Sequence, residues 1–200
     1  PQLIKEMQSQ FLSIASENVA FEYDFTCDGH QINVDPPMLK QALFCIVQNA
    51  VESIPDSRPG VVEIVAKTGI KSFNGHEVGY FGPPVKAGSY ICIQVVDNGC
   101  GIDFSHLSRI FDPFFTTKYT GRGLGLSSVL GMLKSHRGSA LVESTAGEGT
   151  KFSLFLPYDT PVADEQQVAE AIAMPSPGRF NAGTALIVDD EESVRDILSE

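Results

Sequence analysis

The chain has 200 residues, of which 42% are hydrophobic, and a formal net charge of -11 at pH 7. This length suits one ordinary domain plus a piece of another, and the hydrophobic fraction is sufficient to bury a core. The sequence has no apolar run of membrane-spanning length, no signal peptide and no basic surface, so we expect neither a membrane segment nor a nucleic-acid partner.

The first third of the chain predicts a strand and a capped helix. The alternation of apolar and polar residues in Val19–Phe25 is typical of a half-exposed strand. Asp35 followed by two prolines predicts a helix start. Apolar residues at helical spacing extend that helix to Ile54, giving it one apolar stripe. The residues before this strand, Leu3–Ile14, are interpreted as the end of a connecting helix.

The middle of the chain is β-type and then irregular. Val61–Lys67 and Ser89–Val96 predict strands, and Thr68–Gly88 between them is rich in Gly and Pro and predicts an excursion or a hairpin loop. Asp103–Tyr119 has little periodicity. Its three phenylalanines beside Pro113 predict a loop that docks its aromatic rings on the body and folds over a ligand.

The rest of the main body predicts one helix and two strands. Leu124–Leu133 is helical in pattern, with Gly138 as its stop. Ala140–Ser144 and Lys151–Leu156 predict strands joined by a glycine turn. The mixture of helices and strands predicts an α/β fold, specifically a two-layer sandwich of a sheet against helices.

The last part of the chain differs in composition. Residues 159–200 contain ten acidic and two basic side chains, whereas residues 1–158 contain fifteen and twelve. Residues 159–183 contain three prolines and predict a linker with a short helical stretch. A buried-type strand at residues 184–188 follows it, and then the acidic pair Asp189-Asp190. Because the main body is nearly balanced in charge, an anionic ligand there would need local donors and a metal ion.

Three glycine-rich motifs occur in order, and they predict a nucleotide site. The first, Asp97-Asn98-Gly99-Cys100-Gly101, puts a carboxylate at the end of an apolar strand, where an adenine amino group is a suitable donor; a plain turn is the alternative. The second, Gly121–Gly125, opens a helix, where unpaired N–H groups favour phosphates. The third, Gly147–Thr150, lies in a turn. The chain contains no Gly-Lys-Ser/Thr, which excludes a P-loop NTPase.

Three further residues complete the predicted site. Asn49 shares one helical face with Cys45 and Glu52, and is interpreted either as a polar edge or as a Mg²⁺ ligand through its amide oxygen. Lys118 and Arg122 are placed to meet phosphate charge; the alternative is a small hydrophobic anchor flanked by exposed basic residues.

In this order the motifs resemble the N, G1, F, G2 and G3 boxes of sensor histidine kinases, over roughly residues 19–157. The boxes correspond to Asn49, Asp97-x-Gly99-x-Gly101, Phe111-x-Pro113-Phe114, Gly121-x-Gly123-x-Gly125 and Gly147-x-Gly149-Thr150. The resemblance implies a Bergerat-type (GHKL) ATP-binding domain that transfers the γ-phosphate of ATP, with Mg²⁺, to a histidine on another domain.

The resemblance also implies residue roles. Asn49 would bind Mg²⁺, Asp97 would recognise adenine, residues 103–122 would form a lid over ATP, and Thr150 would support the adenine end. The implied nucleotide-contacting residues are Asn49, Asp97, Gly99, Gly101, Ile102, Lys118, Gly121, Arg122, Gly123, Leu124, Gly125, Leu126 and Thr150.

The resemblance further implies a fragment of a longer, cytoplasmic or membrane-anchored kinase. Asp189 and Asp190 would hold Mg²⁺ in a receiver domain once that domain is complete, and a homodimer would form through the missing phosphoacceptor domain. Reduced cysteines fit the cytoplasm. The expected organisation is the end of a connecting helix (residues 1–18), the ATP-binding domain (19–158), a linker (159–183) and the start of a receiver domain (184–200).

Cys45 departs from the pattern of the family, which has Asn, or Glu in its ATPase relatives, four residues before the metal-binding Asn. A thiol is a poor ligand for a hard metal ion. Two alternatives therefore stay open: a non-catalytic ATP-binding regulatory module, and a GHKL-class ATPase, which the missing carboxylate disfavours. A serine kinase of the anti-sigma type is a further relative, disfavoured by the receiver-like tail. The chain's histidines are interpreted as surface or structural residues: His30, His76, His106 and His136.

Overall fold

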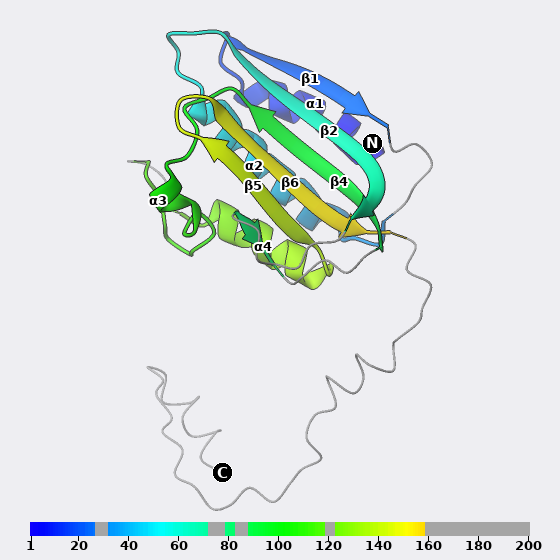
Figure 1. Cartoon of the computed structure of the whole chain (residues 1–200). Helices are drawn as coiled ribbons and strands as arrows, with labels where there is room; N and C mark the ends of the chain where they lie inside the picture. The colour runs from blue at the N-terminus through cyan, green and yellow to red at the C-terminus, as the bar shows by residue number, and fades with distance from the viewer. Residues whose placement is uncertain (27–31, 72–78, 83–87, 119–122, 159–200) are drawn as a thin grey trace, which may run out of the picture. The chain divides into compact units, whose positions relative to one another are not determined.

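Alternating strands and amphipathic helices give a mixed sheet with helices against it (Figure 1). The computed structural model describes residues 1–26, 32–71, 79–82, 88–118 and 123–158. Within them the elements in chain order are α1 (Gln2–Ile14), β1 (Val19–Phe25), α2 (Pro36–Ser53), β2 (Gly60–Lys71), β3 (Tyr80–Phe81), β4 (Gly88–Asp97), α3 (Phe104–Leu107), α4 (Gly125–Ser135), β5 (Ser139–Thr145) and β6 (Gly149–Pro157).

The sheet of the described residues has the strand order β1-β2-β4-β6-β5-β3. β1 pairs with β2 in parallel, and the other neighbours are antiparallel. β4 and β6 lie in the middle of the sheet, and their register places Asp97 opposite Thr150. The first and third glycine motifs are therefore adjacent, although about fifty residues separate them in the chain.

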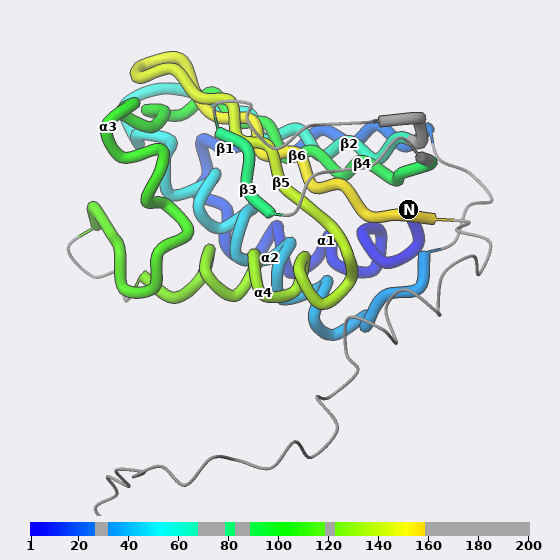
Figure 2. Tube along the Cα trace, turned by 60° about the horizontal axis from the view of Figure 1, so that its bottom comes forward, coloured from blue at the N-terminus to red at the C-terminus, as the bar shows by residue number. Residues whose placement is uncertain are grey.

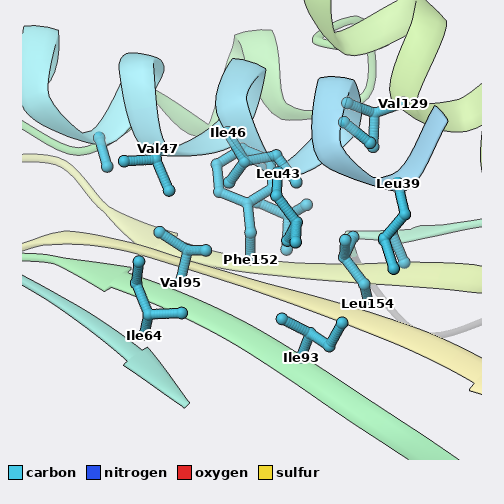
Figure 3. Close-up of a cluster of buried hydrophobic side chains, with 14 of the residues drawn as sticks. Leu39, Leu43, Ile46, Val47, Ile64, Ile93, Val95, Val129, Phe152 and Leu154 are labelled. Atoms are coloured by element: carbon cyan, nitrogen blue, oxygen red, sulfur yellow. The ribbon is translucent and has the colours of Figure 1, made fainter. Parts of the chain in front are cut away.

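Helices α1, α2 and α4 cover one face of the sheet (Figures 1 and 2). The apolar stripe of α2 points at the central strands, and Figure 3 shows its side chains meeting those of β2, β4 and β6. This layer of helices on a mixed sheet confirms the predicted two-layer α/β sandwich. The labelled residues of this core are Leu39, Leu43, Ile46, Val47, Ile64, Ile93, Val95, Val129, Phe152 and Leu154.

Helix α1 packs into the same core as the rest of the sandwich. Ile4, Met7 and Phe11 are 2%, 1% and 0% exposed and belong to the main hydrophobic cluster. Their i, i+3, i+7 spacing gives the helix a single apolar face. The predicted helix at residues 3–14 is thus present, and it belongs to the compact unit that spans Pro1–Thr160.

Local signals set the start of α2. The side chain of Asp35 accepts a hydrogen bond from the backbone N–H of Met38 at 2.9 Å, and Pro36 and Pro37 occupy the first helical positions. This is the cap that the sequence predicts, because an N-cap carboxylate satisfies a free N–H group and proline has none to satisfy.

Three predicted elements differ from the structure. β2 extends to Lys71, and Tyr80–Phe81, placed by the sequence in a loop, is the short strand β3 paired with β5. Helix α4 begins at Gly125, one residue later than predicted, because Leu124 is its N-cap. It ends at Ser135. The residue with positive φ after this helix is Arg137, not Gly138. Gly138 is instead required by packing, since a Cβ there would lie 2.7 Å from the Phe155 carbonyl oxygen.

The predicted linker, the strand at residues 184–188 and the pair Asp189-Asp190 lie outside the described residues. In the part of the chain that is described, no helix is long and apolar enough to cross a membrane.

Candidate functional site

The first glycine motif forms a loop, Asp97–Gly101, that we call the base loop. Asp97 ends β4 and is only 6% exposed. One of its carboxylate oxygens, Oδ1, accepts hydrogen bonds from Ser53 Oγ at 3.0 Å and from the Gly99 backbone N–H at 2.9 Å. A buried carboxylate needs such donors, because burial without them is strongly unfavourable. The side chain is therefore desolvated and oriented at once.

The environment of Asp97 shifts the pKa of its carboxyl group. Burial raises the pKa of this carboxyl group above its usual range, because it disfavours the charged form. The hydrogen bonds from Gly99, Ser53 and the Thr150 backbone, and the charge of Arg58, act in the opposite direction. A buried titratable group with specific partners at a strand end is a candidate for ligand recognition.

The turn between β5 and β6, Thr145–Thr150, packs against the base loop, and we call it the closing turn. The backbone N–H of Gly147 donates to the Cys100 carbonyl at 2.8 Å. Gly101 has φ +66, and a Cβ there would lie 2.1 Å from the Thr145 carbonyl oxygen. The contact between the base loop and the closing turn therefore requires glycine at position 101. From the sequence alone, glycine at this position suggested the close approach of a ligand.

Thr150 lies beside Asp97 and is 5% exposed. Its hydroxyl is 2.9 Å from the hydroxyl of Ser144, which also donates to the Gly149 carbonyl and accepts from the Ile102 backbone N–H. One serine hydroxyl thus joins β5, the closing turn and the end of the base loop. Sequence reasoning missed Ser144, since serine in a strand has no distinctive pattern.

Sequence reasoning also missed Arg58 and Ser53, which hold the base loop from the other side. Arg58 donates to the carbonyl oxygens of Asn98 and Gly99, the latter at 2.8 Å. The Cys100 backbone N–H donates to the Ser53 carbonyl at 2.8 Å. These contacts join residues forty or more positions apart, so no local signal predicts them.

The other end of the site is a polar cluster of Asn49, Glu52 and Lys118. The Lys118 ammonium donates to Asn49 Oδ1 at 3.1 Å and lies 2.5 Å from Glu52 Oε2. The sequence placed Asn49 and Glu52 on one face of α2, and both contact the same cation. In the described part of the chain, no group of three or more His, Cys, Asp or Glu side chains could hold a metal ion by itself.

Helix α2 connects the two ends of the site. Ser53, which contacts Asp97, lies four residues after Asn49, which contacts Lys118. Four residues correspond to about 6 Å along a helix axis. The α2 residues that contact the buried acceptor and the Lys118 ammonium therefore lie about one turn apart on the same helix.

The segment after the base loop is anchored by some of its aromatic residues. Phe111 is buried against Phe81, with ring centroids 4.4 Å apart, and Phe115 is half-buried with the Arg109 guanidinium over its ring at 4.7 Å. Phe114 is 75% exposed. The expectation that all three rings dock on the body is therefore wrong for Phe114.

The second glycine motif leads into α4, as predicted. Gly123 has φ +67 and accepts a hydrogen bond from the Phe114 backbone N–H at 2.9 Å. A Cβ on Gly123 would lie 2.4 Å from the Phe114 carbonyl carbon, so the residue must be glycine. Gly125 begins the helix, and its first N–H groups have no partner within the helix. Gly121 and Arg122 lie outside the described residues.

The remaining predicted contact residues flank these elements. Ile102 and Leu126 are partly buried and pack against the main core, whereas Leu124 is 45% exposed. Cys45 faces α4: it is half-buried, and its Sγ would be 3.6 Å from a Cβ on Gly125.

His136 and His106 have the structural character that the sequence suggested, and His30 and His76 lie outside the described residues. His136 Nε2 accepts a hydrogen bond from the Asp35 backbone N–H at 3.0 Å, while Nδ1 lies 2.8 Å from the Met132 carbonyl oxygen. The ring thus ties the end of α4 to the start of α2. The ring of His106 packs edge-on against Phe115.

Comparison with known proteins accounts for this arrangement. A family model described as "Histidine kinase-, DNA gyrase B-, and HSP90-like ATPase" matches residues 34–160. The chain belongs to this family. The match contains every described residue of the candidate site, including Asn49 at one end and Thr150 at the other.

Two relatives that the chain resembles are named as kinases. The chain is 39% identical over 128 residues to the signal transduction histidine-protein kinase AtoS of Escherichia coli (strain K12), which covers 64% of this chain and 18% of that protein. It is 28% identical over 203 residues to the sensor kinase CckA of Brucella abortus (strain 2308), covering 96% of this chain and 20% of that one. The chain thus spans about a fifth of the length of these relatives.

Solved structures confirm the fold. The mycobacterial sensor histidine kinase MprB superimposes with a TM-score of 0.62 at 20% identity, covering 78% of this chain and 94% of that chain. Full-length ShkA in complex with AMPPNP gives 0.56 at 23% identity, covering 81% of this chain and 30% of that one. These likenesses establish the GHKL (Bergerat) architecture that the sequence predicted.

Proposed function

We propose that this chain is the ATP-binding catalytic domain of a two-component sensor histidine kinase and that it transfers the γ-phosphate of ATP to a histidine on another domain. The observation that carries the proposal is that α2 contacts both polar ends of the site, buried Asp97 through Ser53 at one end and Lys118 through Asn49 at the other. A nucleotide likewise has two chemically different ends, with a base at one end and phosphates at the other. The kinase names of the relatives support this choice within the family.

The base end accepts adenine in this proposal. The carboxylate of Asp97 can accept a further hydrogen bond beyond those from Ser53, Gly99 and the Thr150 backbone, because its two oxygens offer about four lone-pair sites, and the adenine amino group is a donor. Thr150 lies beside it, opposite Asp97 in the sheet, and supports this end of the site. A site built to accept a hydrogen bond rejects a base that lacks the donor, because its buried acceptor is then left unpaired.

The phosphate end fits a divalent cation. Asn49 Oδ1 already faces a cation, since the Lys118 ammonium is its hydrogen-bond donor. Amide and carboxylate oxygens are the ligands that Mg²⁺ prefers, and Mg²⁺ keeps several waters and phosphate oxygens in its shell. Asn49 would therefore hold Mg²⁺, with Glu52 next to it on the helix. The metal ion would supply charge neutralisation on the phosphates.

The residues of this chain position the phosphate chain for transfer. The first N–H groups of α4, after Gly123 and Leu124, bind phosphate oxygens, and Lys118 pairs with them across the site. Gly121 and Arg122 belong to the same segment by sequence. Phosphoryl transfer depends on positioning and charge stabilisation, so the protein needs no nucleophile of its own here. In this proposal the acceptor histidine belongs to another domain.

The partners follow from this role. We propose a phosphoacceptor domain of the same protein, which also forms a homodimer, and a receiver domain that begins at residue 184 with Asp189 and Asp190 at its Mg²⁺ site. The alignment with the CckA protein supports similarity beyond the family model, because it covers 96% of this chain. The reaction would take place in the cytoplasm.

One observation favours a second candidate, a non-catalytic ATP-binding module. Cys45 is half-buried beside the start of α4, and Gln41 Nε2 lies 3.5 Å from its sulfur. No carboxylate stands there to activate water, which also disfavours a GHKL-class ATPase. The two candidates differ in chemistry, because the module binds ATP without phosphorylating a histidine.

Nucleotide binding and transfer are measured separately. The purified chain is titrated with AMPPNP with and without Mg²⁺, and is then mixed with labelled ATP and a separately produced helical hairpin that carries a phosphoacceptor histidine. Mg²⁺-dependent binding and an acid-labile phosphate on the hairpin are the expected results. Absence of AMPPNP binding would refute the ATP site, binding without transfer would favour the module, and steady ATP hydrolysis by the chain alone would favour the ATPase.

A further inference from the structure

Arg58 holds the base loop by two consecutive carbonyl groups. It lies in the loop between α2 and β2, 40 residues before Asn98, and is half-buried. Its Nη2 atom donates to the carbonyl oxygens of both Asn98 and Gly99, the latter at 2.8 Å. Both N–H groups of a single guanidinium nitrogen are therefore used on adjacent peptide groups.

One of these carbonyls belongs to the peptide group that orients Asp97. The Asn98 carbonyl and the Gly99 N–H form one planar peptide unit. Its oxygen is bound by Arg58, and its N–H donates to Asp97 Oδ1 at 2.9 Å. Because the unit is rigid, holding the oxygen also aims the N–H at the carboxylate. A hydrogen bond to the oxygen further polarises the N–H as a donor.

We propose that Arg58 is a positioning residue for base recognition, acting on Asp97 through the Asn98–Gly99 peptide and thereby setting the preference for a 6-amino purine over a 6-oxo purine. The inference rests on the proposed ATP-binding function. Adenine presents an amino donor where guanine presents a carbonyl acceptor. A carboxylate held in one orientation accepts from the first and repels the second, and a loosely held one discriminates less.

Arg58 is itself held from the opposite side. The side chain of Asn18 donates to the Arg58 carbonyl at 2.8 Å and to the Pro55 carbonyl at 3.1 Å, and its backbone carbonyl accepts from the Gly60 N–H at 2.8 Å. The loop that carries Arg58 is thus closed onto the turn before β1. Lysine would not reproduce the contact, since its ammonium lacks the planar pair of N–H groups that a guanidinium nitrogen offers.

Selectivity separates this role from a purely structural one. The purified chain and the variants Arg58→Ala and Arg58→Lys are titrated with ADP and with inosine diphosphate, which carries an oxygen in place of the adenine amino group. Lys67→Ala is the control, because Lys67 is an exposed cation on β2 paired with Asp24. Thermal unfolding of each variant is measured alongside.

In Arg58→Ala the affinity for ADP should fall about tenfold, equivalent to one net hydrogen bond, with little change for inosine diphosphate. Arg58→Lys should lose part of this selectivity, and Lys67→Ala none. In an Asp97→Asn background, Arg58→Ala should have no further effect on ADP, since the group it positions is changed.

An unchanged ratio of the two affinities in Arg58→Ala would overturn the inference, even if the variant were less stable. If that variant does not fold, Arg58→Lys decides: full selectivity overturns the role, and reduced selectivity supports it. A parent chain that binds no ADP rejects the proposed function and the inference together. A parent chain that binds ADP while both variants keep its selectivity rejects only the role of Arg58.

Discussion

The substitution Asp97→Asn separates the charge of the base loop from its shape. The amide keeps one oxygen, which can accept the bonds that Ser53 Oγ and the Gly99 N–H donate at 3.0 and 2.9 Å. Its other polar atom becomes a donor where the carboxylate had an acceptor. The loop should therefore keep its conformation, while the acceptor that the adenine amino group needs is lost.

The magnitude follows from the kind of bond that is lost. A hydrogen bond to a charged group contributes about 1.5–3 kcal/mol. Its loss should therefore raise the Kd for ADP about 10- to 150-fold. The weakening should depend on the base, so the affinity for inorganic polyphosphate should not change.

The stability of the Asp97→Asn variant should change in the opposite direction to its affinity for ADP. Burial raises the pKa of Asp97 in the folded chain above its unfolded value. Such a group favours the folded state fully below the unfolded pKa, and this contribution is lost as pH rises through the folded pKa. At neutral pH the Asp97→Asn variant should therefore be at least as stable as the parent chain. The difference in stability between the variant and the parent chain should narrow as the pH falls through the raised pKa of Asp97.

Titration calorimetry with ADP and thermal unfolding between about pH 4 and pH 8 measure both effects. Asp24→Asn is the matched control, because Asp24 is a half-exposed carboxylate on β1, 3.3 Å from Lys67. An Asp97→Asn variant that binds ADP like the parent would show that Asp97 is a turn residue. Equal losses of ADP affinity in Asp97→Asn and Asp24→Asn would attribute the effect to net charge.

Four further substitutions test other parts of the site. Gly149→Ala should lower the free energy of unfolding in urea by roughly 2–4 kcal/mol, because φ is +129 and the Cβ would lie 2.0 Å from the Asp97 carbonyl oxygen. Gly147→Ala, with φ +88 and open space around it, should lose only about 1–2 kcal/mol; equal losses would contradict the packing argument. Lys118→Ala should weaken ATP binding about tenfold and leave AMP binding unchanged, and equal effects on both would remove Lys118 from the phosphate end. Cys45→Asn should raise the Mg²⁺-dependent affinity for ATP, and no change would show that the thiol is not a deficit.

The elements that could be predicted carry local signals. The cap at Asp35, the two prolines after it and the apolar stripe of α2 lie within one segment, so the sequence alone places that helix. β3 carries no such signal. Its two residues are held by pairing with β5 and by the ring of Phe81 against Phe111, contacts that exist only once the sheet has formed.

The residues of the site fall into the same two groups, those with a local sequence signal and those without one. Asp97, Asn49 and Thr150 could be identified because their residue types stand at distinctive positions relative to strands, helices and glycines. Arg58 and Ser144 could not, since arginine in a loop and serine in a strand are common and their partners come from other elements. The residues proposed to touch a ligand leave a pattern in the sequence, whereas the residues that hold them in place leave little.

The glycines of the base loop show why this distinction matters. A Cβ on Gly99 would lie 1.8 Å from Ser53 Oγ, and one on Gly101 would lie 2.1 Å from the Thr145 carbonyl oxygen. Both residues are glycine because the loop is compressed between the end of α2 and the closing turn. The same compression excludes water from Asp97, which raises its pKa and leaves few orientations open to the carboxylate. A desolvated, oriented acceptor discriminates strongly between bases because an unmatched ligand leaves it unpaired. Dense packing around the loop would therefore contribute to the proposed base selectivity as well as to stability.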